Sequence, residues 1–215
     1  MRSVLITGGT VRLGAAIAER LRVEGWRVIT SSHRADAGAD IIADLAEPMG
    51  PAKLYSAALQ ILGGTPPDAL VNNAALFTGD AAAIEAVNLE APKKLTMMMA
   101  GRETSVGSIV NILDTKALDA YRRFSTPTDA YLASKRALAA FTRTAAATFA
   151  ATLRVNGVAP GPVLAPTEVH VKAGETLLDR RPTADDVAAA VSYLLGAEAT
   201  TGTIIPVDAG QHLLH

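Results

Sequence analysis

Short runs of valine, isoleucine and leucine alternate with longer helical patterns, and this alternation restricts the fold more than any other feature of the chain. The apolar runs predict strands over residues 3–7, 26–31, 40–43, 69–72, 108–113, 154–158 and 203–207. The intervening segments predict helices over residues 12–24, 51–62, 81–100, 127–152 and 184–195. Continuously apolar strands that alternate with helices are typical of a parallel sheet covered on both faces. The sequence therefore predicts one α/β domain, residues 1–215, in which helices flank a seven-stranded parallel sheet.

The ends of the predicted helices carry suitable residues, but one connection is unusually short. Gly25 follows the first helix, where glycine often ends a helix in the left-handed conformation. Thr183 and Asp186 have the spacing of a capping box before the last helix. Only SHRADAGA, residues 32–39, separates the second and third strands. Because a crossover between parallel strands needs about a dozen residues, we expect that helix to be shortened or lost.

The composition excludes several classes of protein. The 215 residues are 49% hydrophobic, which is typical of a globular domain. The 20 basic and 21 acidic residues leave a net charge of −1, which favours neither nucleic acid nor a membrane surface as a partner. The chain has no cysteine, and His33 has no second ligand at metal spacing, so we expect no metal site. No secretory signal or long apolar stretch is present, and we expect a cytoplasmic protein.

The residues TGGTVRLG, 7–14, lie between the first predicted strand and the first predicted helix. A strand, a glycine turn and a helix in this order place a pyrophosphate against the N–H groups of the helix N-terminus, as in the Rossmann fold. The pattern predicts a dinucleotide-binding site, although any tight turn also needs glycine. Arg12 is unexpected, because a guanidinium stands where such loops usually have a small residue.

The end of the second predicted strand favours NADP(H) as the cofactor. An NAD site usually has an acidic residue here that accepts from the ribose 2′-hydroxyl, whereas residues 31–35 read SSHRA. Arg34 and the hydroxyls of Ser31 and Ser32 would suit a 2′-phosphate, and Arg12 would add a second positive charge. His33 is expected to contact the cofactor as a hydrogen-bonding residue of the same loop. The alternative is that Arg34 is a solvated loop charge without a ligand.

The stretch YLASK places Tyr131 and Lys135 four residues apart. On a helix both side chains then lie on one face, within reach of each other. A neighbouring ammonium favours the phenolate form of a tyrosine, so the phenol gives up its proton more easily. The spacing alone is common on exposed helices, but downstream of a glycine loop it indicates an acid–base pair.

Together these motifs make the chain resemble the short-chain dehydrogenase/reductase family over nearly its whole length. Further motifs of the family are DL at 44–45, NNAA at 72–75, VNLEAP at 87–92, PGPV at 160–163 and VDAG at 207–210. The resemblance implies that the following residues contact the cofactor: Gly8, Thr10, Leu13, Gly14, Asp44, Leu45, Asn72, Ala74, Pro160, Gly161 and Val163. It also implies that Tyr131 is the general acid, that Lys135 binds the nicotinamide ribose and that Asn88 holds a water in the proton relay.

Three departures point to a particular substrate. The strand IVNILD places Asp114 where the family usually has a serine, and an ionised carboxylate cannot donate to a ketone oxygen. Asp114, together with Arg12 in the glycine loop, resembles the pteridine reductase and dihydromonapterin reductase subgroup. That resemblance implies that Arg12 reaches both cofactor phosphate and pterin, and that Phe77 stacks on the pterin. Alternatively, Phe77 is a core aromatic residue and Asp114 is a structural carboxylate.

These observations predict an NADPH-dependent reductase that transfers hydride to a dihydropterin-like small molecule. The expected catalytic residues are Asp114, Tyr131, Lys135 and Asn88, and the expected substrate contacts are Arg12, Phe77, Asp114 and Tyr131. Two alternatives stay open: a carbonyl reductase or alcohol dehydrogenase that works without the serine, and a non-catalytic regulator that binds NADP(H).

Two further expectations concern surfaces. The predicted helix with Tyr131 and Lys135 has a face of small residues that would allow close packing between subunits. Because the family that the chain resembles usually forms dimers or tetramers, this face predicts a homodimer or homotetramer. The face comprises Ala139, Thr142, Ala146 and Ala150. The segment 163–181 would close over the substrate. Glu168, His170 and Lys172 lie in this segment, and the sequence does not show which of them would contact the substrate.

Overall fold

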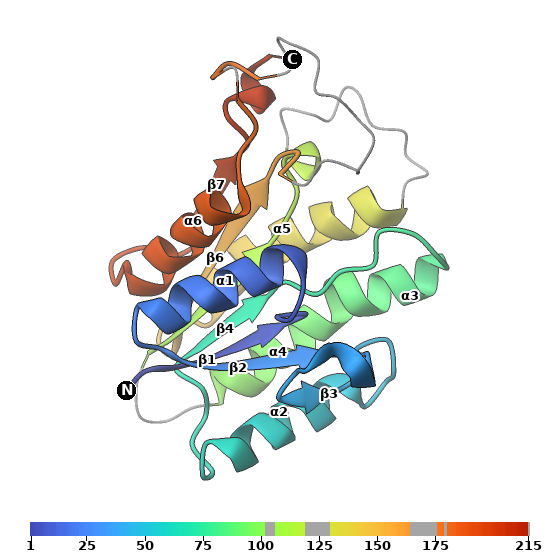
Figure 1. Cartoon of the computed structure of the whole chain (residues 1–215), viewed down its shortest axis with the longest axis vertical. Coiled ribbons are helices and arrows are strands. Elements are labelled where there is room, and N and C mark those ends of the chain that lie inside the picture. The colour runs from blue at the N-terminus through green and yellow to red at the C-terminus, as the bar shows by residue number, and fades with distance from the viewer. Residues whose placement is uncertain (102–105, 119–129, 164–175, 179, 215) are drawn as a thin grey trace.

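A single parallel sheet of seven strands organises the computed structural model, which describes residues 1–101, 106–118, 130–163, 176–178 and 180–214. The strands are β1 (Ser3–Thr7), β2 (Arg27–Ser32), β3 (Ile41–Ile42), β4 (Ala69–Asn72), β5 (Gly107–Ile112), β6 (Leu153–Pro160) and β7 (Ile204–Val207). Their order is β3-β2-β1-β4-β5-β6-β7, and every neighbouring pair is parallel. The predicted α/β fold with a seven-stranded parallel sheet is confirmed (Figure 1).

Helices cover both faces of the sheet. The helices are α1 (Arg12–Val23), α2 (Gly50–Ile61), α3 (Ala81–Glu85), α4 (Ala91–Ala100), α5 (Ala130–Thr148) and α6 (Ala184–Gly196). Figure 1 shows α1 and α6 together on one face, and α2, α4 and α5 on the other. This arrangement explains why the central strands β1, β4 and β5 are buried along their whole length, since helices shield both of their faces from water.

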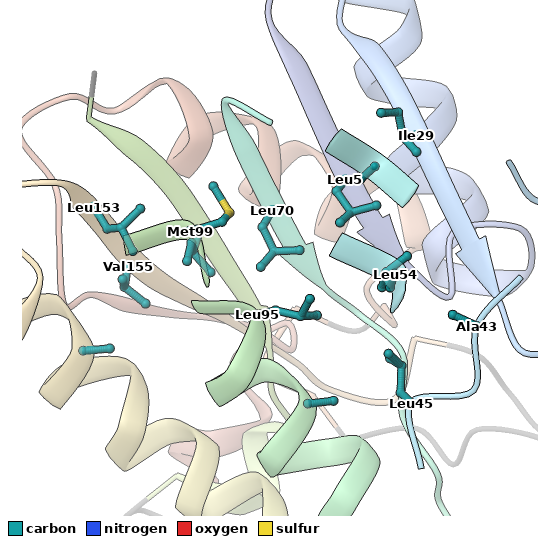
Figure 2. Packing of buried hydrophobic residues seen from close by; sticks show 14 of the residues in the cluster. Leu5, Ile29, Ala43, Leu45, Leu54, Leu70, Leu95, Met99, Leu153 and Val155 are labelled. Carbon is teal, nitrogen blue, oxygen red and sulfur yellow. The ribbon is translucent and has the colours of Figure 1, made fainter. Parts of the chain in front are cut away.

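Alternate residues of each strand supply two separate apolar clusters. In β1, Val4 and Ile6 pack with Ile17 of α1 and Val187 of α6. Leu5, between them in the sequence, points to the opposite face and joins a cluster with residues of α2, α4 and α5. Figure 2 shows this second cluster, in which Leu5, Leu70, Leu54, Leu95 and Met99 are fully buried. Burial of each such side chain contributes roughly 1.5–3 kcal/mol, so both faces hold the sheet in place.

The connection between β2 and β3 is as short as expected. One 3-10 turn, Ala35–Ala37, replaces the crossover helix, and Gly38 ends it with a φ of 63°. The strand that follows is only Ile41–Ile42, shorter than the predicted 40–43. Because the partner of β3 is β2 alone, this short edge strand leaves the loop after β2 open to solvent.

Two predicted helices differ in detail from those observed. The single helix predicted over 81–100 is interrupted by a π-helical turn, Ala86–Glu90, which separates α3 from α4 and contains Asn88. The helix predicted over 127–152 is described as α5, Ala130–Thr148, and its first predicted residues, 127–129, lie outside the described residues. The C-terminal part is shorter because residues 149–152 turn into β6 instead of continuing the helix.

The prediction that the small-residue face of α5 packs between subunits needs correction. Ala139, Thr142 and Ala146 are buried within their own chain, because α5 packs this face on β5 and β6. The fourth predicted residue, Ala150, is exposed but lies in the turn beyond the end of α5. Thr142 Oγ1 accepts from Asn111 Nδ2 at 2.9 Å and donates to the Leu138 carbonyl oxygen at 2.7 Å. The three buried residues therefore cannot form a subunit interface, and the prediction of a homodimer or homotetramer loses that support.

The described part of the chain contains neither a helix that could span a membrane nor a metal-binding cluster. Among those residues, no helix has the length and apolar character needed to cross a membrane. The same residues contain no cluster of three or more histidine, cysteine, aspartate or glutamate side chains that would hold a metal ion.

The last helix begins with the predicted capping box. Thr183 Oγ1 accepts from the Asp186 backbone N–H at 3.1 Å, and Asp186 Oδ2 accepts from the Thr183 backbone N–H at 2.8 Å. Arg180 adds a two-point ion pair to Asp186, which holds the pKa of that carboxyl well below its usual value. The cap fixes where α6 starts, directly after the segment that follows β6.

We expect Thr183→Ala to lower the free energy of unfolding by about 1 kcal/mol, because it removes the acceptor for one N–H group of the first turn. Thr183→Ser keeps that acceptor and should unfold like the wild type. Denaturant unfolding followed by circular dichroism measures both. Equal stability of the alanine and wild-type chains would mean that the box contributes nothing.

Candidate functional site

The predicted site residues gather at the carboxyl edge of the sheet, where the strand order reverses between β1 and β4. In open α/β sheets ligands bind in the crevice at this point. The glycine turn follows β1, the serine and arginine loop follows β2, and segments after β4, β5 and β6 complete the edge. The topology therefore brings together motifs that are far apart in the sequence.

The glycine turn between β1 and α1 is built for close backbone packing. Gly8 has a φ of 62°, and a Cβ atom on Gly14 would lie only 2.0 Å from the Gly8 carbonyl oxygen. The residue that precedes the helix, Val11, provides no side-chain cap. The first N–H groups of α1 have no intrahelical acceptors, so they are available to a ligand. This turn fits a pyrophosphate.

Arg12 takes up an uncommon backbone conformation at the start of α1. Its φ is 52°, in the left-handed region that favours glycine, and its side chain is exposed. A non-glycine residue held there costs roughly 1–3 kcal/mol. Such strain is characteristic of functional sites, and here it places a guanidinium beside the pyrophosphate turn. Thr10 and Leu13, also predicted to contact the cofactor, lie in the same turn.

Asn73 holds the glycine turn to β4, a role that the sequence analysis missed. Its side-chain amide donates to the Thr7 and Gly8 carbonyl oxygens at 3.0 and 2.9 Å. In return, Thr7 Oγ1 accepts from the backbone N–H groups of Asn73 and Ala74, each at 3.0 Å. The motif NNAA contains Asn73, but the motif predicts a cofactor contact for its neighbour Asn72. Asn72 instead donates to Asn111 Oδ1 on β5 at 2.8 Å and ties the two central strands together.

The loop after β2 carries the residues predicted to hold a 2′-phosphate. Ser32 Oγ accepts from the Arg34 backbone N–H at 3.0 Å, and the exposed His33 lies between them. The Arg34 side chain pairs with Asp36, a residue that the sequence analysis did not assign. Asp44 and Leu45 follow β3. Asp44 Oδ1 accepts from the Ala46 N–H at 2.8 Å, while Leu45 is buried in the core.

Tyr131, Asp114 and Lys135 form one cluster between β5 and α5. The Tyr131 hydroxyl donates to Asp114 Oδ2 at 3.1 Å. Lys135, one helical turn later, donates from Nζ to the Ile112 carbonyl oxygen at 2.8 Å. Its ammonium also lies 5.8 Å from the centre of the Tyr131 ring. The aspartate that replaces the usual serine is therefore in direct contact with the phenol.

Burial changes the acid–base behaviour of Lys135. The side chain is only 2% exposed, and loss of solvation lowers its pKa to about 8, although the nearby Asp114 carboxylate acts in the opposite direction. Desolvation disfavours the charged form of an amine, whereas an opposite charge favours it. At neutral pH the group is still mostly protonated, so an ammonium lies beside Tyr131 and Asp114.

Asn88 connects two segments of the site through its side chain. Its Oδ1 accepts from the Leu76 N–H at 2.8 Å, and its Nδ2 donates to the Leu76 carbonyl oxygen at 2.9 Å. Nδ2 also donates to Ser134 Oγ at 3.0 Å, and Ser134 in turn donates to the Tyr131 carbonyl oxygen at 2.7 Å. Both amide hydrogens are thus engaged within the chain. Asn88 and the unpredicted Ser134 hold the loop after β4 against α5.

Phe77 is placed at the mouth of the site by that loop. Its ring centre lies 4.6 Å from the ring centre of Tyr131, and the planes are tilted by 55°. The side chain is 72% exposed, so the alternative that Phe77 is a core aromatic residue does not hold. An exposed aromatic face next to the phenol is available for stacking with a planar ligand.

The turn after β6 closes the site on the other side. The Pro160 carbonyl oxygen accepts from Thr115 Oγ1 at 3.3 Å, and the Gly161 N–H donates to the Val207 carbonyl oxygen at 2.9 Å. A Cβ atom on Gly161 would lie 2.5 Å from Asp208 Cβ, so this position must be glycine. Val163 packs on the face that carries α1. Glu168, His170 and Lys172 lie outside the described residues.

Comparisons with known proteins agree with this geometry. A family model described as enoyl-(acyl carrier protein) reductase matches residues 11–212. The chain therefore belongs to the short-chain dehydrogenase/reductase family, whose members bind a nicotinamide cofactor.

Individual relatives differ in what their names say they act on. The chain is 31% identical to a ketoacyl reductase of granaticin polyketide synthesis from Streptomyces violaceoruber, covering 98% of this chain and 96% of that protein. It is 27% identical to pteridine reductase 1 of Leishmania tarentolae, covering 97% and 96%. The crystal structure of FolM alternative dihydrofolate reductase 1 from Brucella canis, complexed with NADP, has a TM-score of 0.86 and 31% identity over 99% of this chain and 94% of that one.

The strain at Arg12 can be measured by substitution. We expect Arg12→Gly to be more stable than Arg12→Ala by about 1 kcal/mol, because only glycine accepts a positive φ without steric cost. The same pair of substitutions at Glu19, an exposed position further along α1, should show the opposite order by about the same amount. Denaturant unfolding gives all four values. If alanine were the more stable residue at both positions, Arg12 would carry no strain.

Proposed function

We propose that this protein is an NADPH-dependent reductase that transfers hydride to a dihydropterin-like ring. The observation that carries the proposal is the hydrogen bond from Tyr131 to Asp114, in the position where the family usually has a serine. The stacking face of Phe77 beside that phenol and the guanidinium of Arg12 at the glycine turn support the same substrate. The pteridine reductase and dihydrofolate reductase relatives are consistent with it.

The cofactor would lie across the carboxyl edge of the sheet. Its pyrophosphate would bind the N–H groups of the turn from Gly8 to Gly14, and Ser32 and Arg34 would hold the 2′-phosphate. NADPH supplies the hydride. Lys135 would hold the nicotinamide ribose, and the turn at Gly161 would flank the nicotinamide.

Tyr131 would deliver the proton that accompanies the hydride. Reduction of an imine carbon leaves charge on the adjacent nitrogen, and a phenol next to an ammonium is a suitable general acid. Asp114 accepts from that phenol and can pass a replacement proton to it when protonated. Asn88 and Ser134 would keep α5 in register with the loop that carries Phe77, so their part is to position the groups that react.

The carboxylate also explains a preference for a nitrogen-containing ring. Asp114 in its ionised form only accepts hydrogen bonds, so it would pair with ring N–H and amino groups. Beside a ketone, the same charge would repel the developing alkoxide instead of stabilising it. Phe77 would stack on the planar ring, which contributes roughly 0.5–1.5 kcal/mol beyond buried area.

A carbonyl reductase is the second candidate, favoured by the ketoacyl reductase relative. It would require Asp114 to be protonated in order to donate to the ketone oxygen. A non-catalytic regulator that binds NADP(H) is the third, but an acid–base cluster with a buried lysine has no use in a protein that only binds.

A substrate panel separates these candidates. We expect purified protein to oxidise NADPH with dihydropterins or dihydrofolate and to leave simple ketones unreacted.

Tyr131→Phe should lower kcat by about 10²–10⁴-fold, since it removes the general acid, while NADPH binding by fluorescence stays the same. Asp114→Ser should weaken pterin turnover. Turnover of ketones alone would contradict the pterin proposal, and full function of the phenylalanine variant would favour the regulator.

The buried lysine predicts an alkaline limit to activity. Lys135 is charged below its pKa of about 8 and loses its proton above it, so kcat/KM for NADPH should fall as the pH rises through about 8. Asp114→Asn removes the carboxylate that raises this pKa, and the falling limb should move to lower pH. A pH–rate profile of each protein measures the effect. An alkaline limb that stays in place in the asparagine variant would contradict the coupling of Lys135 to Asp114.

A further inference from the structure

Among the described residues, the loop after β2 contains one ion pair, between Arg34 and Asp36. Arg34 is the residue proposed to bind the 2′-phosphate. Arg34 Nε donates to Asp36 Oδ1 at 3.1 Å, and Arg34 Nη2 donates to Asp36 Oδ2 at 2.8 Å. Two parallel hydrogen bonds of this kind are the arrangement in which a guanidinium also binds two oxygens of a phosphate. The carboxylate therefore occupies the face of Arg34 that a phosphate would use.

This ion pair is not what shapes the loop. At the base of the loop, Asp40 Oδ2 accepts from the Thr30 backbone N–H and from Thr30 Oγ1, each at 2.8 Å. At the tip, Gly38 ends the 3-10 turn in the left-handed conformation, and Ser32 Oγ accepts from the Arg34 N–H. The path of the backbone is thus fixed by groups other than the two charged side chains.

Both charged side chains are also open to water. The Arg34 side chain is 63% exposed and the Asp36 side chain is 71% exposed. Exposed ion pairs are weak because water solvates each partner and salt screens the attraction. An incoming phosphate can therefore replace the carboxylate, but only by separating an existing pair.

We propose that Asp36 competes with the 2′-phosphate of the cofactor for Arg34 and thereby limits how strongly the site prefers NADPH to NADH. The inference rests on the proposed assignment of Arg34 to that phosphate. NADH carries no 2′-phosphate and leaves the ion pair intact, so the competition weakens only the binding of NADPH.

Four variants test the competition by binding alone. Asp36→Asn removes the charge and keeps the shape, Arg34→Ala removes the cation, and the double variant combines them. Glu19→Gln, on the exposed face of α1, is the control for the same change in net charge. Dissociation constants of NADPH and NADH are measured by fluorescence titration at low ionic strength, and thermal unfolding of each variant checks that the fold is kept.

We expect Asp36→Asn to tighten NADPH binding by about two- to fivefold and to change NADH binding far less. Arg34→Ala should weaken NADPH binding strongly, and adding Asp36→Asn to it should have no further effect, because the asparagine acts only by freeing Arg34. Glu19→Gln should leave both constants unchanged.

Three results would overturn the inference. If Asp36→Asn tightened NADPH equally with and without Arg34, the carboxylate would act by general repulsion and not by competition. If Arg34→Ala weakened NADPH while Asp36→Asn changed nothing, the competition would be absent but the proposed cofactor would stand. If neither substitution affected NADPH, the assignment of Arg34 and the cofactor part of the proposed function would fail together.

Discussion

The hydrogen bond from the buried Lys135 ammonium to the Ile112 carbonyl oxygen fixes the chemistry of this site. It joins α5 to the end of β5 at 2.8 Å, inside a core where a charged group is costly to bury. With that register set, Tyr131 one turn earlier on the helix must face Asp114, two residues beyond Ile112. Burial of the ammonium also moves its pKa to about 8. The contact thus fixes which groups meet, and the burial of the ammonium lowers the pKa at which Lys135 loses its proton.

The cofactor side of the site depends on backbone geometry more than on side chains. Gly14 lets α1 start directly against the Gly8 carbonyl group, and Asn73 holds that turn to β4. Arg12 is the exception, because it accepts a strained backbone in order to put a cation at the turn. Proteins retain such strain where it places a functional group, and this supports a role for Arg12 with a phosphate or substrate.

Most of the fold, and the meeting of Tyr131, Lys135 and Asp114 in one cluster, could be predicted from the sequence. Strand positions follow from apolar runs, and Tyr131, Lys135 and Asp114 lie at fixed spacings from elements that parallel topology brings to one edge. The π-helical turn at Asn88 could not be predicted, because its pattern of apolar residues resembles that of an α-helix. Asn73 was missed because its side chain bonds to backbone groups of a distant segment, and Ser134 was missed because its distant partner is the Asn88 side chain. The small-residue face of α5 was misassigned because a pattern of alanines does not reveal whether it faces a partner or its own sheet.

Asp114 also sets this cluster apart from one that contains a serine in the same place. With a serine in its place, the cluster at neutral pH would contain one positive charge, that of Lys135, and this would favour loss of the Tyr131 proton. Asp114 adds a negative charge 3.1 Å from the phenol oxygen, which opposes the formation of a second anion there. The carboxylate thus offsets the effect of the Lys135 ammonium on the phenol, which a serine hydroxyl would not do. Because the group that is the acid in one direction is the base in the other, this offset acts on both directions of the reaction alike.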